Sequence, residues 1–120
     1  MSSQSLYAQF AKETVGWETL EDEHSFVTYQ IQEVGPIKCI KVIEMFTVPS
    51  HRGKDKWRSL MESIEQIGRD NKCKTISAQI SKSTSEFTQQ RTAHLCRLFC
   101  MENTYEDIYQ IIYSRGIKNE

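Results

Sequence analysis

A basic loop is the stretch of this sequence whose residue types and spacing point most directly to chemistry. Residues 49 to 57 read PSHRGKDKW, in which Arg52, Gly53 and Lys54 stand between a β-branched run and an amphipathic stretch. Free backbone N–H groups and the positive end of the dipole make the start of a helix a good place to bind phosphate groups, and glycine lets a ligand approach the backbone. An anion site is therefore one interpretation of this loop.

Two residues of the same loop, Asp55 and Trp57, oppose an anion site. A carboxylate about 4 Å from a phosphate costs on the order of 4 kcal/mol at an effective dielectric constant near 20. Since each 1.4 kcal/mol or so is a factor of ten, a micromolar site could become millimolar. The indole takes up space that a ligand needs. We expect Asp55 to cap the following helix, a contribution of about 1 kcal/mol, and Trp57 to pack in phase with Leu60 and Met61.

The elements that position this loop are two strands before it and a helix after it. Residues 25 to 34 alternate as a strand does, Gly35 and Pro36 break the run, and residues 37 to 48 form a second, β-branched run, which together predict an antiparallel hairpin. Apolar residues at spacings of three and four from Trp57 onward predict a helix. The alternating run KTISAQIS then predicts a strand parallel to the one before the helix, joined to it by a right-handed crossover.

The remaining segments complete one α+β domain over residues 1 to 120. Apolar residues at helical spacing before Gly16 predict a short N-terminal helix, and the acidic run at 18 to 24 is expected to be a solvated loop. Ser83 and Glu86 favour a capping box that opens a second main helix. The run YEDIYQIIYS supplies a last strand. The predicted fold is a mostly antiparallel sheet with a central βαβ unit and two main helices packed on it.

The loop resembles motif A of the GNAT superfamily of acyl-CoA-dependent N-acetyltransferases. The resemblance is carried by the run PSHRGK, after a strand and before an amphipathic helix, and the order of elements fits that fold over residues 25 to 113. The region before it is shorter than the family's first strand and pair of helices. The resemblance implies that Arg52, Gly53 and Lys54 bind the diphosphate of acetyl-CoA. Counted from Arg52, however, the motif's two small residues fall on Asp55 and Trp57, so we expect a vestigial site that these two residues block.

The resemblance also implies catalytic residues, of which few are present. Family members often use a glutamate on the strand before the loop as general base, and Glu44 occupies that strand, although it can equally be a solvated strand residue. The family's last helix often carries an asparagine and a tyrosine, followed by a glycine and an aromatic residue. The matching positions here are Gln89, Cys96, Cys100 and Met101. The tyrosine that protonates the leaving thiolate is missing.

Composition limits the classes of function. Fifteen Lys and Arg against sixteen Asp and Glu leave a net charge of −1, so no global field attracts nucleic acid or an anionic membrane. Basic residues cluster beside Trp57, but in a neutral chain we expect a solvated helix start there and no nucleic-acid site. No run approaches the roughly 20 apolar residues of a membrane span, and the N-terminus lacks the apolar core of a signal peptide, which favours a cytoplasmic protein.

The four cysteines are expected to be reduced, because an intracellular compartment disfavours disulfides. Cys96 and Cys100 lie one helical turn apart with His94 nearby, but no second ligand pair is spaced to match. We therefore expect no metal site. The run from Tyr105 to Tyr113 carries more apolar residues than one sheet face needs. It can supply either a protein interface or core packing on both faces, and the sequence leaves both open.

Two functions of different classes follow from these residues. The leading hypothesis is a GNAT-like domain with an eroded acetyl-CoA site and no cofactor, which acts as a protein-binding or assembly module or self-associates. A GNAT-like chain without evident catalytic equipment resembles some proteins encoded by bacteriophages, including virion components, in which case the location would be the virion. The alternative is an active N-acetyltransferase that binds acetyl-CoA through Arg52, Gly53 and Lys54 and uses Glu44 as base.

Overall fold

The computed structural model describes residues 5 to 117. Within this range the chain forms three α-helices, six strands and one short 3-10 helix. In chain order they are α1 (Leu6–Val15), β1 (Glu18–Glu21), β2 (Ser25–Val34), β3 (Ile37–Thr47), η1 (Pro49–His51), α2 (Lys54–Asp70), β4 (Thr75–Ser81), α3 (Glu86–Leu98), β5 (Glu102–Glu106) and β6 (Gln110–Gly116).

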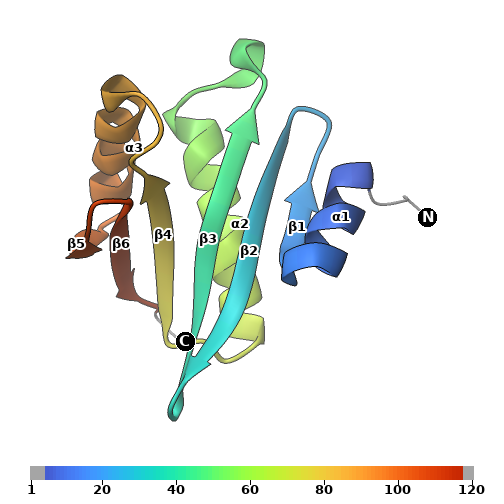
Figure 1. Ribbon diagram of the computed structural model, residues 1–120, viewed down its shortest axis with the longest axis vertical. Helices are drawn as coiled ribbons and strands as arrows, with labels where there is room; N and C mark the ends of the chain where they lie inside the picture. The colour runs from blue at the N-terminus through green and yellow to red at the C-terminus, as the bar shows by residue number, and fades with distance from the viewer. Residues whose placement is uncertain (1–4, 118–120) are drawn as a thin grey trace.

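The six strands form one sheet in the order β1-β2-β3-β4-β6-β5 (Figure 1). Only β3 and β4 are parallel, and α2 makes the crossover between them. All other neighbours are antiparallel. The predicted α+β class, the mostly antiparallel sheet and the central βαβ unit are confirmed.

The helices cover the two faces of the sheet unequally. α2 and α3 contact each other and pack on one face, whereas α1 lies over β1 and β2 on the opposite face (Figure 1). The predicted end of α1 is confirmed, because Gly16 ends the helix in the left-handed conformation, with φ of 74°. At its start, the Ser5 side chain accepts from the Ala8 N–H.

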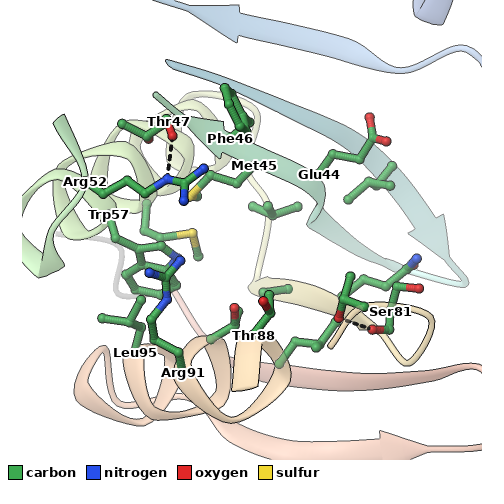
Figure 2. A pocket seen from close by; sticks show the side chains of 18 of the residues that line it. Glu44, Met45, Phe46, Thr47, Arg52, Trp57, Ser81, Thr88, Arg91 and Leu95 are labelled. Carbon is green, nitrogen blue, oxygen red and sulfur yellow. Dashed lines mark hydrogen bonds between the residues drawn. The ribbon is translucent and has the colours of Figure 1, made fainter. Parts of the chain in front are cut away.

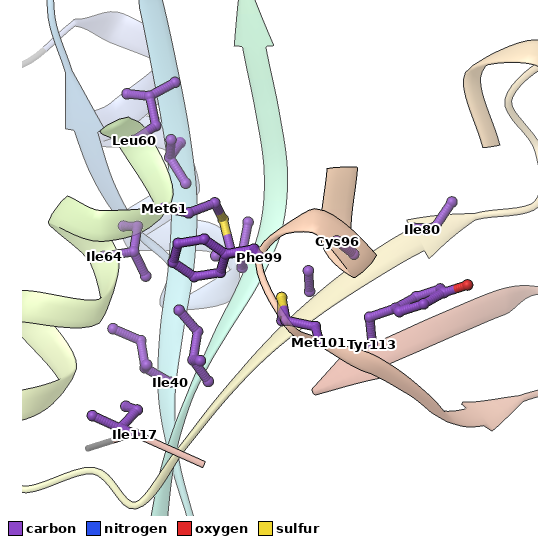
Figure 3. Close-up of a cluster of buried hydrophobic side chains, with 14 of the residues drawn as sticks. Ile40, Leu60, Met61, Ile64, Ile80, Cys96, Phe99, Met101, Tyr113 and Ile117 are labelled. Atoms are coloured by element: carbon purple, nitrogen blue, oxygen red, sulfur yellow. The ribbon is translucent and has the colours of Figure 1, made fainter. Parts of the chain in front are cut away.

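The core lies between the sheet and the apolar face of α2 (Figure 3). Leu60, Met61 and Ile64 are buried there, as the predicted helical stripe requires. Gly68 allows the last turn of α2 to approach the sheet, because a Cβ at this position would lie 2.9 Å from Cγ2 of Ile40. Full burial of an aliphatic side chain of this size contributes roughly 1.5–3 kcal/mol.

A buried ion pair ties α2 to the end of the sheet. Arg115 of β6 donates from Nη1 to Oε2 of Glu65 at 2.6 Å and from Nη2 to Oε1 at 3.0 Å. Its Nε donates to the carbonyl of Phe99 at 2.9 Å, and the guanidinium lies 4.4 Å from the centre of that ring. One arginine therefore joins α2, β6 and the segment that follows α3.

The acidic run at 18 to 24 is not only a loop, so that prediction is wrong. Residues 18 to 21 form β1, an edge strand that pairs antiparallel with β2. Leu20 packs against the core, while the glutamates at both ends of the strand make polar contacts with α1 and its cap. The sequence gives no clear signal for this strand, because both of its end residues are charged. A four-residue edge strand buries only one face and needs few apolar residues.

The C-terminal region forms two strands where one was predicted. β5 and β6 pair as a hairpin, and its turn is stabilised by Asp107, whose Oδ1 accepts from the N–H groups of Tyr109 and Gln110. An Asp can build such a turn without glycine, so the turn has no strong sequence signal. Tyr105, Ile108 and Tyr109 are exposed around it.

The start of α3 also differs from the prediction. The N-cap is Ser85, whose Oγ accepts from the Thr88 N–H at 3.1 Å, and not Ser83. Ser83 instead bonds to Ser81, the last residue of β4. Of the helix itself, Ala93 and Cys96 are the buried residues.

Candidate functional site

The parallel strands β3 and β4 separate part-way along their length. They pair only from Cys39–Val42 against Thr75–Ala78, although β3 continues to Thr47 and β4 to Ser81. The pairing of β3 with β2 shifts at the same place: Tyr29 lies opposite Val42 and Thr28 opposite Glu44, which leaves Ile43 as a bulge. A bulge bends its strand, and Figure 1 shows the two strands diverging beyond it.

A cavity of about 660 Å³ lies in this opening, within the usual range of ligand sites. Its walls come from both separated strands, from the loop and first turns of α2, and from α3 (Figure 2). The charged or aromatic residues that line it are Glu44, Phe46, Arg52, Lys54, Trp57 and Arg91. The residues predicted from the sequence to bind an anion, Arg52, Gly53 and Lys54, and the predicted general base, Glu44, therefore line the same cavity.

The loop before α2 contributes Arg52, Gly53 and Lys54 to the cavity wall. Arg52 is turned back on β3: its Nε donates to the carbonyl of Thr47 at 2.7 Å and its guanidinium lies 5.3 Å from the Phe46 ring centre. Gly53 is the N-cap and offers no side-chain acceptor. The first N–H groups of α2 thus have no side-chain cap.

Asp55 does not have the role predicted for it. It is the second residue of α2, it is exposed, and its side chain makes no cap hydrogen bond. The extended backbone of Gly53 places the cap two residues earlier, so the expected capping by Asp55 is wrong. Its carboxylate still lies in the first turn, where the helix dipole favours negative charge. Asp55 is not among the residues that line the cavity.

Trp57 takes part in both the core and the cavity wall. It is half-buried, and its indole meets Phe99 edge-on, with ring centres 5.9 Å apart and an interplanar angle of 86°. The expected core packing is thus confirmed for one part of the ring. The side chain also lines the cavity, and Figure 2 shows it projecting there from the first turn of α2.

Glu44 lies on β3 at the opposite side of the cavity from α3. Its Oε1 accepts hydrogen bonds from the hydroxyl of Tyr7 on α1 and from Oγ1 of Thr28 at 3.3 Å. The hydrogen bond to Glu44 raises the pKa of Tyr7 to about 12. Oε2 makes no hydrogen bond to the described residues, which leaves half of the carboxylate available to a ligand.

Residues of α3 complete the cavity, and the sequence interpretation missed them. Thr88, Arg91, Thr92 and Leu95 line it from one face of the helix. Their spacing of three and four is the signal that could have identified them, because it places all of them on one side of a helix. Arg91 is exposed and makes no ion pair with residues 5 to 117.

The loop is fastened to the turn between β1 and β2. Lys56 donates to Oδ2 of Asp22 at 2.6 Å, and this bond lowers the pKa of Asp22 below its ordinary value. His51 stacks on His24 with ring centres 3.5 Å apart, and the Val48 N–H donates to the His24 carbonyl. His24 is thus a contact of the loop.

The fold of this chain is similar to that of several solved acetyltransferase structures. A protein named as an acetyltransferase of the GNAT family, from Desulfovibrio desulfuricans, superposes with a TM-score of 0.68 and 12% identity over 93% of this chain and 78% of that one. A protein named as an acyl-CoA N-acyltransferase, from Klebsiella pneumoniae, gives 0.66 and 13% over 94% and 85%. Nourseothricin acetyltransferase gives 0.64 and 15% over 79% of this chain.

The fold is that of the GNAT acetyltransferases. This chain spans 58% of the length of nourseothricin acetyltransferase. No protein-family model matches the sequence, and no curated protein matches it.

The end of α3 can be compared with the GNAT pattern. Cys100, which stands where the pattern has glycine, adopts the left-handed conformation with φ of 63°, and Met101 is buried where the pattern has an aromatic residue. Cys96 stands where the tyrosine is expected, but its thiol is fully buried, and burial raises its pKa to about 12. Gln89 donates to the carbonyls of Lys82 and Thr84 and so holds the loop before α3.

The structure also describes the cysteines, possible metal ligands and the apolar character of the helices. The four cysteines are free thiols. Among residues 5 to 117 there is no cluster of three or more His, Cys, Asp or Glu side chains with the geometry of a metal site. No helix in that range is long and apolar enough to cross a membrane.

Proposed function

We propose that the protein is a GNAT-fold module that does not transfer acetyl groups and that binds another protein through its cleft. The observation that carries this proposal is the position of Trp57. Its indole lines the cavity from the first turn of α2. A diphosphate bound by the first N–H groups of a helix must approach that turn closely, and a large ring there competes for the same space.

Electrostatics add to the steric argument. Asp55 stands in the same turn as Trp57, so a diphosphate at the helix start would meet a carboxylate. Asp55 is exposed, and solvent screening reduces the repulsion below the value for a pair near the protein interior. We therefore assign the larger part of the block to Trp57.

The proton transfer that ends acetyl transfer also lacks a donor on α3. The thiol of Cys96 is buried, is absent from the cavity wall and has a pKa of about 12. A general acid has to reach the leaving group and works best with a pKa near the operating pH. Cys96 meets neither condition.

Exposed apolar residues support a role in protein contacts. Tyr105, Ile108 and Tyr109 gather at the β5–β6 hairpin, next to the loop between β4 and α3, where the Lys82 N–H donates to the Tyr109 carbonyl at 2.8 Å. Aromatic residues of this kind are enriched at protein interfaces. We place the module in the cytoplasm or, for a phage-encoded chain, in the virion.

Thermal unfolding with and without millimolar acetyl-CoA tests the proposal. A ligand at 100 times its dissociation constant adds about 2.7 kcal/mol to the free energy of unfolding, which is easily seen as a rise in Tm. We expect no rise. A clear upward shift that saturates with acetyl-CoA concentration would refute the loss of coenzyme binding.

The second candidate is an active acetyl-CoA-dependent N-acetyltransferase. The observation that favours it is the open cavity, which Glu44, Arg52, Gly53 and Lys54 line together while Asp55 does not. In that case Oε2 of Glu44 accepts the proton of the amine. Release of free CoA thiol in the presence of a panel of amines and peptides would support this candidate, provided that Glu44→Gln abolishes the release.

A further inference from the structure

The separation of β3 and β4 leaves strand backbone without a neighbouring strand in the middle of the sheet. Residues 43 to 47 of β3 and 79 to 81 of β4 face the cleft beyond the last pair of the parallel ladder, Val42 and Ala78. We propose that an extended, acidic segment of a partner protein binds in this cleft and pairs as a strand with the free edge of β3. The proposal rests on the non-catalytic function above and names the chemistry of its partner.

Unpaired backbone favours a peptide as the occupant. Strand N–H and C=O groups need hydrogen-bond partners, and a free strand edge is a template for another strand. Here the edge lies inside the sheet, with β2 on the far side of β3 and β6 on the far side of β4. A peptide bound by strand addition satisfies these groups through its own main chain, which requires no particular side chains.

The length of the free edge sets the length of the bound segment. Residues 43 to 47 span roughly 17 Å at about 3.3 Å per residue. A partner segment of about five residues therefore spans this edge. The Thr47 carbonyl already accepts from Arg52 Nε, so the pairing uses the backbone groups before it, and the bulge at Ile43 ends the pairing at the narrow side of the cleft.

Charge selects an acidic segment. Three cations line the cleft, Arg52, Lys54 and Arg91, and none of them makes an ion pair within the described chain. Glu44 is the one carboxylate in the lining, so the cations outnumber it three to one, and its Oε1 is turned toward the hydroxyls of Tyr7 and Thr28. Electrostatic complementarity across an interface favours the correct partner and suppresses those of like charge.

The apolar wall provides sites for alternate side chains. In a bound strand every second side chain points to the same face. On the side of α2 and α3 these side chains meet Trp57 and Leu95. The cleft therefore fits a segment in which acidic residues alternate with apolar or β-branched ones.

Selection from a library of random decapeptides displayed on phage provides the test. The library is first depleted on Thr92→Trp, which fills the cleft, and then selected on the unchanged protein. We expect enriched sequences in which Asp or Glu alternates with apolar residues. A synthetic peptide of the enriched sequence should bind about tenfold more weakly when two alternate backbone nitrogens are methylated, because strand hydrogen bonds are lost.

Charge reversal distinguishes peptide binding in the cleft from binding elsewhere on the surface. Arg91→Glu should weaken binding of the acidic peptide at least about tenfold. Arg58→Glu is the matched control, since Arg58 is exposed on α2 but does not line the cleft, and it should bind as the unchanged protein does. Circular dichroism of each variant checks that the fold is retained.

Any of three outcomes would overturn the inference. The selection could enrich basic sequences, or it could enrich no sequence on the unchanged protein beyond those that also bind Thr92→Trp. The N-methylated peptide could also bind as tightly as the unmethylated one. A concentration-dependent dimer that Arg91→Glu dissociates would assign the cleft to a second copy of the chain instead. Failure of the proposed function is seen separately, as a Tm rise with acetyl-CoA, whatever the peptide selection gives.

Discussion

Removal of the Arg115 side chain should destabilise the protein strongly, because it leaves the buried carboxylate of Glu65 without its main partner. The side chain of Glu65 is 8% exposed and that of Arg115 21% exposed. In Arg115→Ala the one cation that the described chain leaves beside the carboxylate is Arg69, at 3.6 Å, and the Phe99 carbonyl loses the hydrogen bond from Arg115. Breaking a buried pair in this way costs about 3–5 kcal/mol. For a domain with a stability of about 5–15 kcal/mol this is a large fraction of the total.

The converse change should cost less. In Glu65→Ala the guanidinium of Arg115 is more exposed than the carboxylate was, and it keeps its bond to the Phe99 carbonyl and its contact with that ring. The structure therefore predicts that Arg115→Ala lowers the free energy of unfolding more than Glu65→Ala does. The order follows from which charge is left buried, and a simple count of lost contacts would not give it.

Urea unfolding followed by circular dichroism at 222 nm measures these changes. The control is Lys82→Ala, which removes the exposed ion pair with Glu106 and should leave the midpoint nearly unchanged. At roughly 4 °C per kcal/mol, Arg115→Ala should also lower Tm by about 12–20 °C. An unfolding midpoint for Arg115→Ala within error of the Lys82→Ala midpoint would refute the reasoning.

Three further predictions concern the packing, the acid sensitivity and the cleft. Gly68→Ala should cost about 1–3 kcal/mol, measured by urea unfolding, because the new methyl group would press on Ile40. The pKa of Asp22 is lower in the fold than in the unfolded chain, so its stabilising effect is present at neutral pH and is lost as the pH falls below about 4; Asp22→Asn should flatten the fall of the urea midpoint between pH 5 and 2. Asp55→Gly with Trp57→Gly should gain acetyl-CoA affinity, detectable by calorimetry, while stability falls by on the order of 2–3 kcal/mol because the indole is half-buried. Unchanged coenzyme binding in the folded double variant would show that other residues block the site.

The parts of the fold that could be predicted are those whose burial imposes a period on the sequence. The stripe of α2, the β2–β3 hairpin and the alternation of β4 all follow from one face packed on the core. β1 and β5 could not be predicted in the same way. They are short edge strands, every residue of β5 is exposed, and neither carries the apolar alternation that burial enforces.

The candidate site was predictable in its loop and strand but not in its third wall. Arg52, Gly53 and Lys54 were found from local spacing, and they line the cavity with Glu44. Arg91 joins them only because α3 packs beside α2, a relation between distant segments that local spacing does not contain. The predicted helix cap was Asp55, whereas the observed one is Gly53, because a glycine can act as N-cap without a side-chain bond.

Calorimetric titration of acetyl-CoA into the protein is the most direct test of the central claim, that Trp57 and Asp55 at the start of α2 prevent the coenzyme from binding. The claim predicts no saturable heat for a protein that remains folded, corresponding to a dissociation constant above about 1 mM. A saturable isotherm with one site per chain and a micromolar dissociation constant would contradict it.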